Sequence, residues 1–108
     1  MLIPKRILTV SSANMDFVMS VSKIPQGGET QLESGTYQFV PGGKGANSAV
    51  AVRRLGGDSV FCCRLGKEAN GSIMHNIYKK EGLDTRFITV DPSAVTGLAT
   101  IMVEPSGQ

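Results

Sequence analysis

The sequence has few of the features that mark specialised protein classes. Its 108 residues include one histidine, two cysteines and no tryptophan, and aromatic residues make up only 6%. No apolar run approaches the ~18 residues of a membrane-spanning helix. No signal peptide is recognised behind Lys5 and Arg6, because polar residues soon interrupt the apolar stretch. The 11 basic and 9 acidic residues are scattered, which argues against a dedicated nucleic-acid or membrane-surface binder.

The few cysteines and the lone histidine indicate neither a disulfide framework nor a metal site. Cys62 and Cys63 are adjacent in an apolar run and have no second pair or partner histidine. Neighbours on a strand point to opposite faces, so we expect both to be buried, reduced thiols of a cytoplasmic protein. His75 lies among polar helical residues and is expected at the surface. The remaining composition, 41% hydrophobic and 19% charged, is that of an ordinary globular protein.

Hydrophobic periodicity predicts an α/β fold. Strands that alternate with helices imply βαβ units, and hence a Rossmann-like parallel sheet with right-handed crossovers. The stretch over 16–40 breaks that alternation and has little apolar area on either face, so we expect it to form an inserted β-lid. The pattern predicts strands over 6–10, 17–21, 30–40, 59–65, 87–90 and 97–103, and helices over 46–55 and 70–81.

The last residues predict a β-turn. Glu104-Pro105-Ser106-Gly107 has proline at the second position and glycine at the fourth. A hairpin turn requires a returning strand, so we expect these 108 residues to be the front part of a longer protein.

The first candidate for a ligand site is the glycine cluster over 42–45. It is not a nucleotide P-loop, because Gly45 stands where that motif needs serine or threonine. Glycines allow a ligand to approach the backbone closely, and the helix that follows offers free N–H groups. Lys44 adds a cation and Asn47 adds a donor and an acceptor, which suits a polyhydroxylated ligand or an anion. The residues alone fit equally well a simple loop-to-helix turn with a solvated Lys44.

The second candidate is Asn14-Met15-Asp16, at the carboxyl end of the first predicted strand. Ligands of open parallel sheets bind at this edge. A carboxylate can accept hydrogen bonds from two hydroxyl groups while an amide fixes orientation, as in many sugar sites. The alternative is that Asn14 and Asp16 cap a turn, and taken alone these residues favour it.

Together, four motifs in compatible order resemble the N-terminal portion of ribokinases, within the phosphofructokinase-B type carbohydrate kinase family. The resemblance covers nearly the whole chain, and its most specific part is the Gly-Gly-Lys-Gly-Ala-Asn string. The motifs are Asn14-x-Asp16, Pro25-x-Gly27-Gly28-Glu29-Thr30, Gly42-Gly43-Lys44-Gly45-Ala46-Asn47 and Thr96-Gly97-x-Ala99-x-Ile101.

The resemblance implies an incomplete ribokinase-like fold and ATP-dependent phosphorylation of a pentose, with D-ribose at its 5-hydroxyl as the first choice. It implies lid segments over about 16–40 and 97–108, which also form the interface of a homodimer. The sugar-binding residues carried over from the resemblance are Asn14 and Asp16 on one side, Gly43, Lys44 and Asn47 on the other, and Ala99 and Ile101 as apolar contacts.

The resemblance also implies what this stretch does not contain. The Gly-Ala-Gly-Asp motif, with the catalytic base and the anion hole, is expected beyond Gln108, together with the sites for ATP, Mg²⁺ and K⁺. The 108 residues alone are therefore expected to be inactive. The chain departs from the family pattern at Ser11, Ser48 and Lys67-Glu68. Two alternatives stay open: a related sugar or nucleoside kinase, and a non-catalytic sugar-binding or dimerisation fragment.

Overall fold

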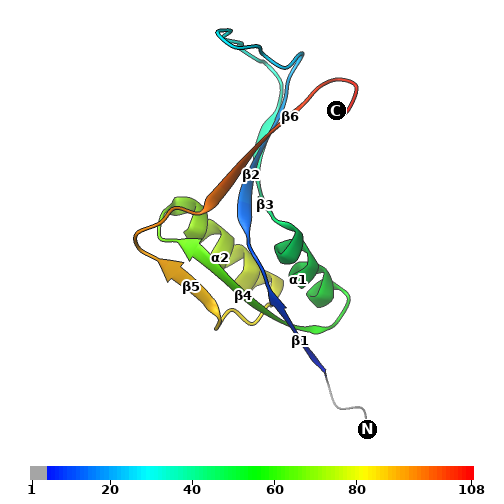
Figure 1. Cartoon of the computed structure of the whole chain (residues 1–108). Coiled ribbons are helices and arrows are strands. Elements are labelled where there is room, and N and C mark those ends of the chain that lie inside the picture. The colour runs from blue at the N-terminus through cyan, green and yellow to red at the C-terminus, as the bar shows by residue number, and fades with distance from the viewer. Residues whose placement is uncertain (1–4) are drawn as a thin grey trace.

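The computed structural model describes residues 5–108 and divides them into a body and a projecting lid (Figure 1). The lid is the sheet β3-β2-β6 with the loop 21–36 and the C-terminal residues 104–108, and the body is the remainder. The radius of gyration is 16.8 Å, above the ~13 Å of a compact domain of this length, because the lid extends away from the body. The elements are β1 (Arg6–Val10), β2 (Asn14–Ser20), β3 (Tyr37–Gly42), α1 (Lys44–Arg54), β4 (Asp58–Gly66), α2 (Ala69–Glu81), β5 (Ile88–Asp91) and β6 (Gly97–Val103).

The body confirms the predicted parallel sheet. Its strand order is β1-β4-β5, and both pairings are parallel. Helices α1 and α2 lie together on one face of this sheet (Figure 1). Each helix is therefore a crossover between parallel strands, as the alternation of strands and helices predicts.

The core lies between β4 and the two helices. Ala46 and Ala49 are 2% and 0% exposed, and these small residues let α1 pack closely on the sheet. Phe61 of β4 contacts Tyr78 of α2 edge to face, with ring centroids 5.4 Å apart. Burial raises the pKa of the neighbouring Cys63 thiol to about 11, with a smaller contribution from Cys62. Both thiols are free, but only Cys63 is buried, so the expectation of two buried thiols is half right.

Glycine ends the second helix as the sequence predicts. Gly82 has a φ of 89°, a left-handed conformation, and its N–H donates to the carbonyl groups of Tyr78 and Lys79. At the other end, the side chain of Glu68 accepts from the N–H of Asn70 and so caps the first turn. The caps fix the length of α2 and bring its N-terminus beside the start of β6.

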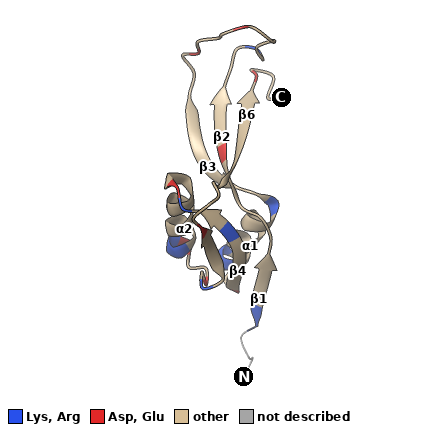
Figure 2. Ribbon diagram, turned by 60° about the vertical axis from the view of Figure 1, so that its left-hand side comes forward, with Lys and Arg blue, Asp and Glu red and all other residues tan. Residues whose placement is uncertain are grey.

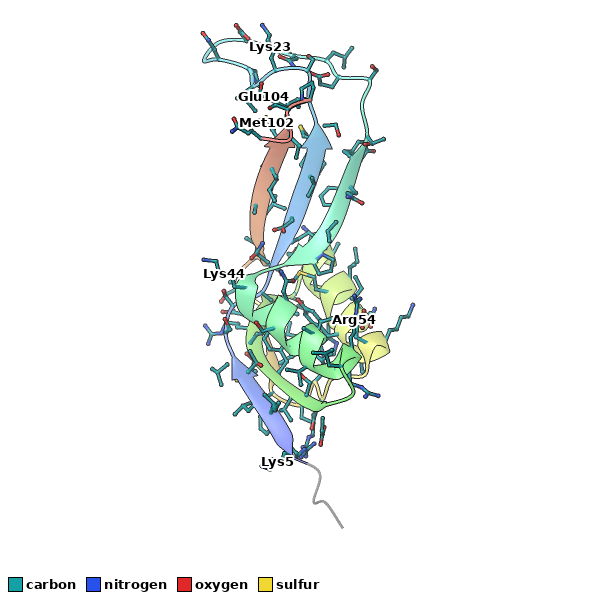
Figure 3. The ribbon with its side chains drawn as sticks, turned by 90° about the vertical axis from the view of Figure 1, so that its right-hand side faces the viewer. Lys5, Lys23, Lys44, Arg54, Met102 and Glu104 are labelled. Carbon is teal, nitrogen blue, oxygen red and sulfur yellow. The ribbon has the colours of Figure 1, made fainter. Side chains whose placement is uncertain are left out.

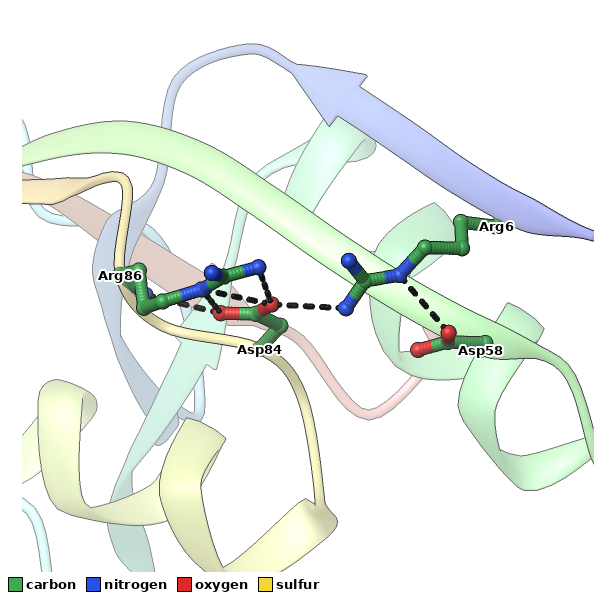
Figure 4. Close-up of polar contacts among 4 residues, drawn as sticks. All are labelled: Arg6, Asp58, Asp84 and Arg86. Atoms are coloured by element: carbon green, nitrogen blue, oxygen red, sulfur yellow. Dashed lines mark hydrogen bonds and ion pairs between the residues drawn. The ribbon is translucent and has the colours of Figure 1, made fainter.

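On the other face of the body sheet, a charged network joins three segments (Figure 4). Arg6 donates to Asp58 at 2.8 Å and to Asp84 at 2.9 Å, and Arg86 donates to Asp84 at 2.7 Å. Hydrogen bonds from Arg86, with help from the charge of Arg6, lower the pKa of Asp84 to about 2. Leu8 is 59% exposed on this face, where no helix packs within residues 5–108.

The lid is a mixed three-stranded sheet with β2 in the middle. β2 pairs antiparallel with β3 and parallel with β6, so that Asp16 lies opposite Val40 on one side and Ala99 on the other. Residues alternate between two faces of such a sheet. One face therefore carries Asp16 and Ala99, and the opposite face carries Phe17, whose ring stacks on that of Phe39 at 4.8 Å.

The structure corrects several predicted boundaries. The second strand runs over Asn14–Ser20 and not over 17–21, because Asn14 already pairs with Gly42 and Gly97. Of the predicted extended stretch 30–40, only the part from Tyr37 is a strand; Glu33 instead accepts hydrogen bonds from the loop residue Ser22. The predicted turn after β6 is present, since the N–H of Gly107 donates to the carbonyl of Glu104 at 2.8 Å. Neither helix in the described part of the chain has the length and apolar character that crossing a membrane requires.

Candidate functional site

A hollow of about 520 Å³ lies at the root of the lid, where β2 leaves the body and α1 begins. The segment between β1 and β2, the first residues of β2 and the first turn of α1 form its walls. All of its lining residues are polar or glycine: Ser11, Ser12, Asn14, Asp16, Gly43, Lys44, Gly45 and Asn47.

Asn14 and Asp16 form one wall and point to the same side of β2. The Asn14 Nδ2 atom donates to Oδ1 of Asp16 at 2.5 Å, which orients the carboxylate. Both residues are half-buried and paired on both sides within the lid sheet, so the alternative that they cap a turn is wrong. Asp16 is the single charged residue of the three lid strands, the red patch at the base of β2 in Figure 2. An isolated carboxylate in an otherwise uncharged sheet is a candidate ligand contact.

Two glycines create the space that Asp16 and Asn14 occupy. A Cβ added to Gly42 would lie 2.6 Å from Cγ of Asp16. Gly43 has a φ of 103°, which disfavours any side chain, and an added Cβ would lie 3.1 Å from Oδ1 of Asn14. The glycine string is therefore more than a flexible turn, because it leaves room for the polar wall opposite.

The first turn of α1 forms the other wall. Gly43 is the N-cap and has no side chain to cap the helix, and the first turn contains no acidic residue. The first N–H groups of α1 therefore remain available to a ligand. Lys44 and Asn47 are exposed at this end of the helix, and Figure 3 shows Lys44 where the body meets the lid.

The hollow thus combines one carboxylate, two amides, one ammonium group and several backbone donors. Hydroxyl groups both donate and accept, so a molecule with several hydroxyl groups can satisfy such a mixed set. The arrangement favours a polyol over a polyanion, because Asp16 would repel negative charge.

Comparison with known proteins agrees with this chemistry. A family model described as pfkB family carbohydrate kinase matches residues 4–108. This chain belongs to the pfkB family of carbohydrate kinases.

Similar members of the pfkB family include sugar kinases of more than one kind. The ribokinase of Haemophilus influenzae is 39% identical over 104 residues, which cover 96% of this chain and 34% of that protein. The probable fructokinase-3 of Arabidopsis thaliana is 35% identical over 102 residues, which cover 94% of this chain and 28% of that protein. The chain therefore spans about a third or less of the length of the curated relatives that it matches.

Solved structures give the same fold. The ribokinase from Giardia lamblia has a TM-score of 0.85 at 31% identity, covering 98% of this chain and 34% of that one. A ribokinase from Cryptococcus neoformans var. grubii, solved in complex with ADP, has a TM-score of 0.82 at 28% identity. The matched region covers 97% of this chain and 32% of the Cryptococcus chain. These similarities confirm a ribokinase-like α/β fold, of which this chain is one part.

The structure brings together five of the seven residues that the sequence assigns to the site. The hollow is lined by Asn14, Asp16, Gly43, Lys44 and Asn47, although the rest of β2, a long loop and β3 separate the first two from the others along the chain. The other two do not line it. Ala99 and Ile101 lie on the same lid face as Asp16, opposite Asp16 and Val18 in the register.

The seven assigned residues leave out three lining residues of the hollow: Ser11, Ser12 and Gly45, of which Gly45 lies within the predicted glycine cluster. The serines directly follow the first predicted strand, and Ser11 enters the prediction only as a departure from the family pattern. Gly45 belongs to the glycine cluster, but a tertiary contact explains why glycine is required there: a side chain at this position would collide with the side chain of Ser11. No local pattern contains that contact, because the two residues come from different walls.

Proposed function

We propose that the full-length pfkB-family protein containing this chain transfers a phosphoryl group from ATP to a sugar, with D-ribose as substrate and ribose 5-phosphate as product. The hollow at the root of the lid carries the proposal, because Asn14, Asp16, Gly43, Lys44 and Asn47 meet there. The names of several relatives support ribose, and those of others support fructose.

In this proposal the chain holds and orients the sugar. The Asp16 carboxylate accepts hydrogen bonds from two sugar hydroxyl groups, and Asn14 fixes that carboxylate. Lys44 and Asn47 donate from the opposite wall. Ala99 and Ile101 supply apolar cover from the lid. Fixing the acceptor hydroxyl is a large part of catalysis here, since phosphoryl transfer relies mainly on positioning and charge stabilisation.

The remaining chemistry belongs to other residues of the full-length protein. As the sugar 5-hydroxyl oxygen bonds to phosphorus, the bond to the leaving nucleoside diphosphate breaks, and the hydroxyl proton passes to a base expected beyond Gln108. The hollow does not fit a triphosphate, because its lining contains a single cation, Lys44, and also the negative carboxylate of Asp16. Within residues 5–108, no group of three or more His, Cys, Asp or Glu residues fits a metal ion. We propose that ATP, Mg²⁺ and K⁺ bind outside this chain, in the part of the full-length protein where the catalytic base is also expected.

A substrate panel on the full-length protein tests the proposal. Ribose, deoxyribose, fructose and a nucleoside are compared in a coupled assay for ADP release, with wild type and Asp16→Asn. We expect ribose to give the highest kcat/KM. Asp16→Asn should lower the kcat/KM for ribose about 10- to 100-fold, because the sugar loses hydrogen bonds to a charged group. Glu29→Gln, a lid-loop carboxylate outside the hollow, is the control and should keep wild-type kinetics. A preference for another substrate, or an undisturbed Asp16→Asn variant, would reject this assignment.

We also propose that the lid mediates a homodimer. The lid face opposite Asp16 carries apolar side chains that remain exposed, including Tyr37 at 68%, Phe39 at 54% and Leu98 at 57%. The Phe17 ring contacts the rings of Tyr37 and Phe39 on this face. Such a patch on an extended sheet suits a second copy of the same lid. Sedimentation of the full-length protein should give a dimer that Phe39→Glu dissociates, and a monomeric wild type would contradict this.

The adjacent thiols support a reducing compartment. Cys62 and Cys63 are both free, so we propose that the full-length protein acts in the cytoplasm.

A second candidate function is sugar binding without catalysis by this stretch, because every sugar-side group named above lies within these 108 residues. Ribose titration of the isolated chain separates binding from phosphorylation, and a coupled assay of the same sample should detect no ADP.

A further inference from the structure

Thr96, the residue before β6, is a buried polar residue at the junction between body and lid. It is 6% exposed, although threonine at a loop-to-strand junction is commonly solvated. The chain passes between body and lid at three points, before β2, after β3 and before β6. Thr96 lies at the third of these, so whatever holds it also holds one edge of the lid.

A single carboxylate holds Thr96 and caps a helix at once. Oε1 of Glu68 accepts from the N–H of Thr96 at 2.8 Å and from its hydroxyl group. Oε2 of the same residue accepts from the N–H of Asn70, in the first turn of α2. The Thr96 hydroxyl in turn accepts from the N–H of Gly66 at 3.0 Å. The end of β4, the start of α2 and the start of β6 are therefore joined by Glu68 and Thr96, which we call the lid-root clamp.

The packing around the lid-root clamp leaves no spare room. A Cβ added to Gly66 would lie 2.7 Å from Oε1 of Glu68 and 2.6 Å from the carbonyl oxygen of Ala94. A Cβ added to Gly71 would lie 2.9 Å from the hydroxyl oxygen of Thr96. The hydrogen bonds from Thr96 also lower the pKa of Glu68, so the carboxylate stays ionised at neutral pH. The clamp is thus charged, closely packed against Gly66 and Gly71, and held by several hydrogen bonds, with Thr96 buried and Glu68 half-buried.

The register connects the clamp to the hollow. Gly97, directly after Thr96, lies opposite Asn14, and Ala99 lies opposite Asp16. A shift of Thr96 therefore moves β6 and, through the pairing, the wall that carries Asn14 and Asp16. The other wall belongs to α1, which is anchored in the core of the body through Ala46 and Ala49. Misplacement of binding groups by about 1 Å is enough to weaken their joint action on a substrate.

We propose that Glu68 and Thr96 are positioning residues: they fix the root of the lid so that the Asn14–Asp16 wall faces the first turn of α1. They do this without touching the sugar, since neither lines the hollow. The expected effect on sugar affinity rests on the proposed function. The claim that Glu68 and Thr96 hold the lid in place does not depend on it.

The test uses the full-length protein with Thr96→Val, Thr96→Ser and Glu68→Gln. Thr85→Val, a half-buried threonine of the body away from the lid, is the control. Thr96→Val and Glu68→Gln should raise the KM for ribose about 3- to 10-fold, because each variant loses about the free energy of one hydrogen bond. Both variants should leave kcat and the KM for ATP within about twofold of wild type. Thr96→Ser keeps the hydroxyl group and should restore the wild-type KM.

Amide hydrogen exchange without sugar gives a second readout. In Thr96→Val and Glu68→Gln, β2 and β6 should exchange at least about threefold faster, while β1 and β4 keep their wild-type protection. If wild type phosphorylates no sugar, the proposed function fails and exchange alone decides the clamp. Unchanged exchange in the lid, unchanged KM in folded variants, or an equal fall of all kinetic parameters would overturn the inference. Should Thr96→Val fail to fold, Glu68→Gln carries the same test.

Discussion

Gly42 should be required for sugar binding although it makes no hydrogen bond to the sugar in this proposal. A Cβ in Gly42→Ala would lie 2.6 Å from Cγ of Asp16, and keeping both groups in place would cost about 1–3 kcal/mol of overpacking. The cheaper response is rotation of the Asp16 carboxylate away from Asn14. The sugar then loses a charged hydrogen bond, about 1.5–3 kcal/mol, so we expect about 10- to 100-fold weaker binding.

Calorimetric titration of the full-length protein with ribose, without nucleotide, measures this loss. Gly27→Ala is the matched control, because an added Cβ there meets nothing within 4 Å. A double-mutant cycle isolates the cause: in an Asp16→Ala background, Gly42→Ala should change the affinity less than about twofold. The reasoning is refuted if Gly42→Ala binds ribose like wild type, or if its effect persists in full after Asp16 is removed.

Two further predictions concern stability. Phe61→Ala removes a fully buried ring that contacts Tyr78 and should cost about 3–5 kcal/mol in urea unfolding; a loss below about 1 kcal/mol would contradict the assigned core. Because the pKa of Asp84 is lowered to about 2 from 3.8, its pairing with Arg86 stabilises the fold above pH about 4, and this is lost as the pH falls toward 2. Asp84→Asn should therefore lower the urea midpoint at pH 7 and match wild type near pH 2, whereas a difference that does not depend on pH would contradict this origin.

Much of the fold could be predicted because its signals are local. Helical spacing of apolar residues predicts both helices to within two residues at each end, and Gly82 ends α2 through its own backbone conformation. The predicted strand over 97–103 coincides with β6. The site was predictable in part for the same reason, since the glycine string and the Asn14-x-Asp16 pair are each readable from neighbouring residues.

The errors fall where long-range pairing decides. Asn14 could be read as a turn residue from its neighbours, but it lies in a strand because Gly42 and Gly97 pair with it. Leu32 belongs to an alternating stretch yet is 98% exposed, because within residues 5–108 no strand or core packs on its side chain. Neither outcome leaves a trace in a short window of sequence.

The amino-acid sequence by itself determined the order of strands and helices. It also determined the turn at which a positive φ favours glycine, as at Gly82, and the chemical groups available to a ligand. The tertiary structure alone decided that β2 lies between β3 and β6, that two serines and Gly45 complete the hollow, and that Glu68 reaches Thr96. The physical reason is separation along the chain: backbone preferences act between neighbours, whereas a shared wall or a hydrogen bond between residues 68 and 96 exists only after the chain has folded.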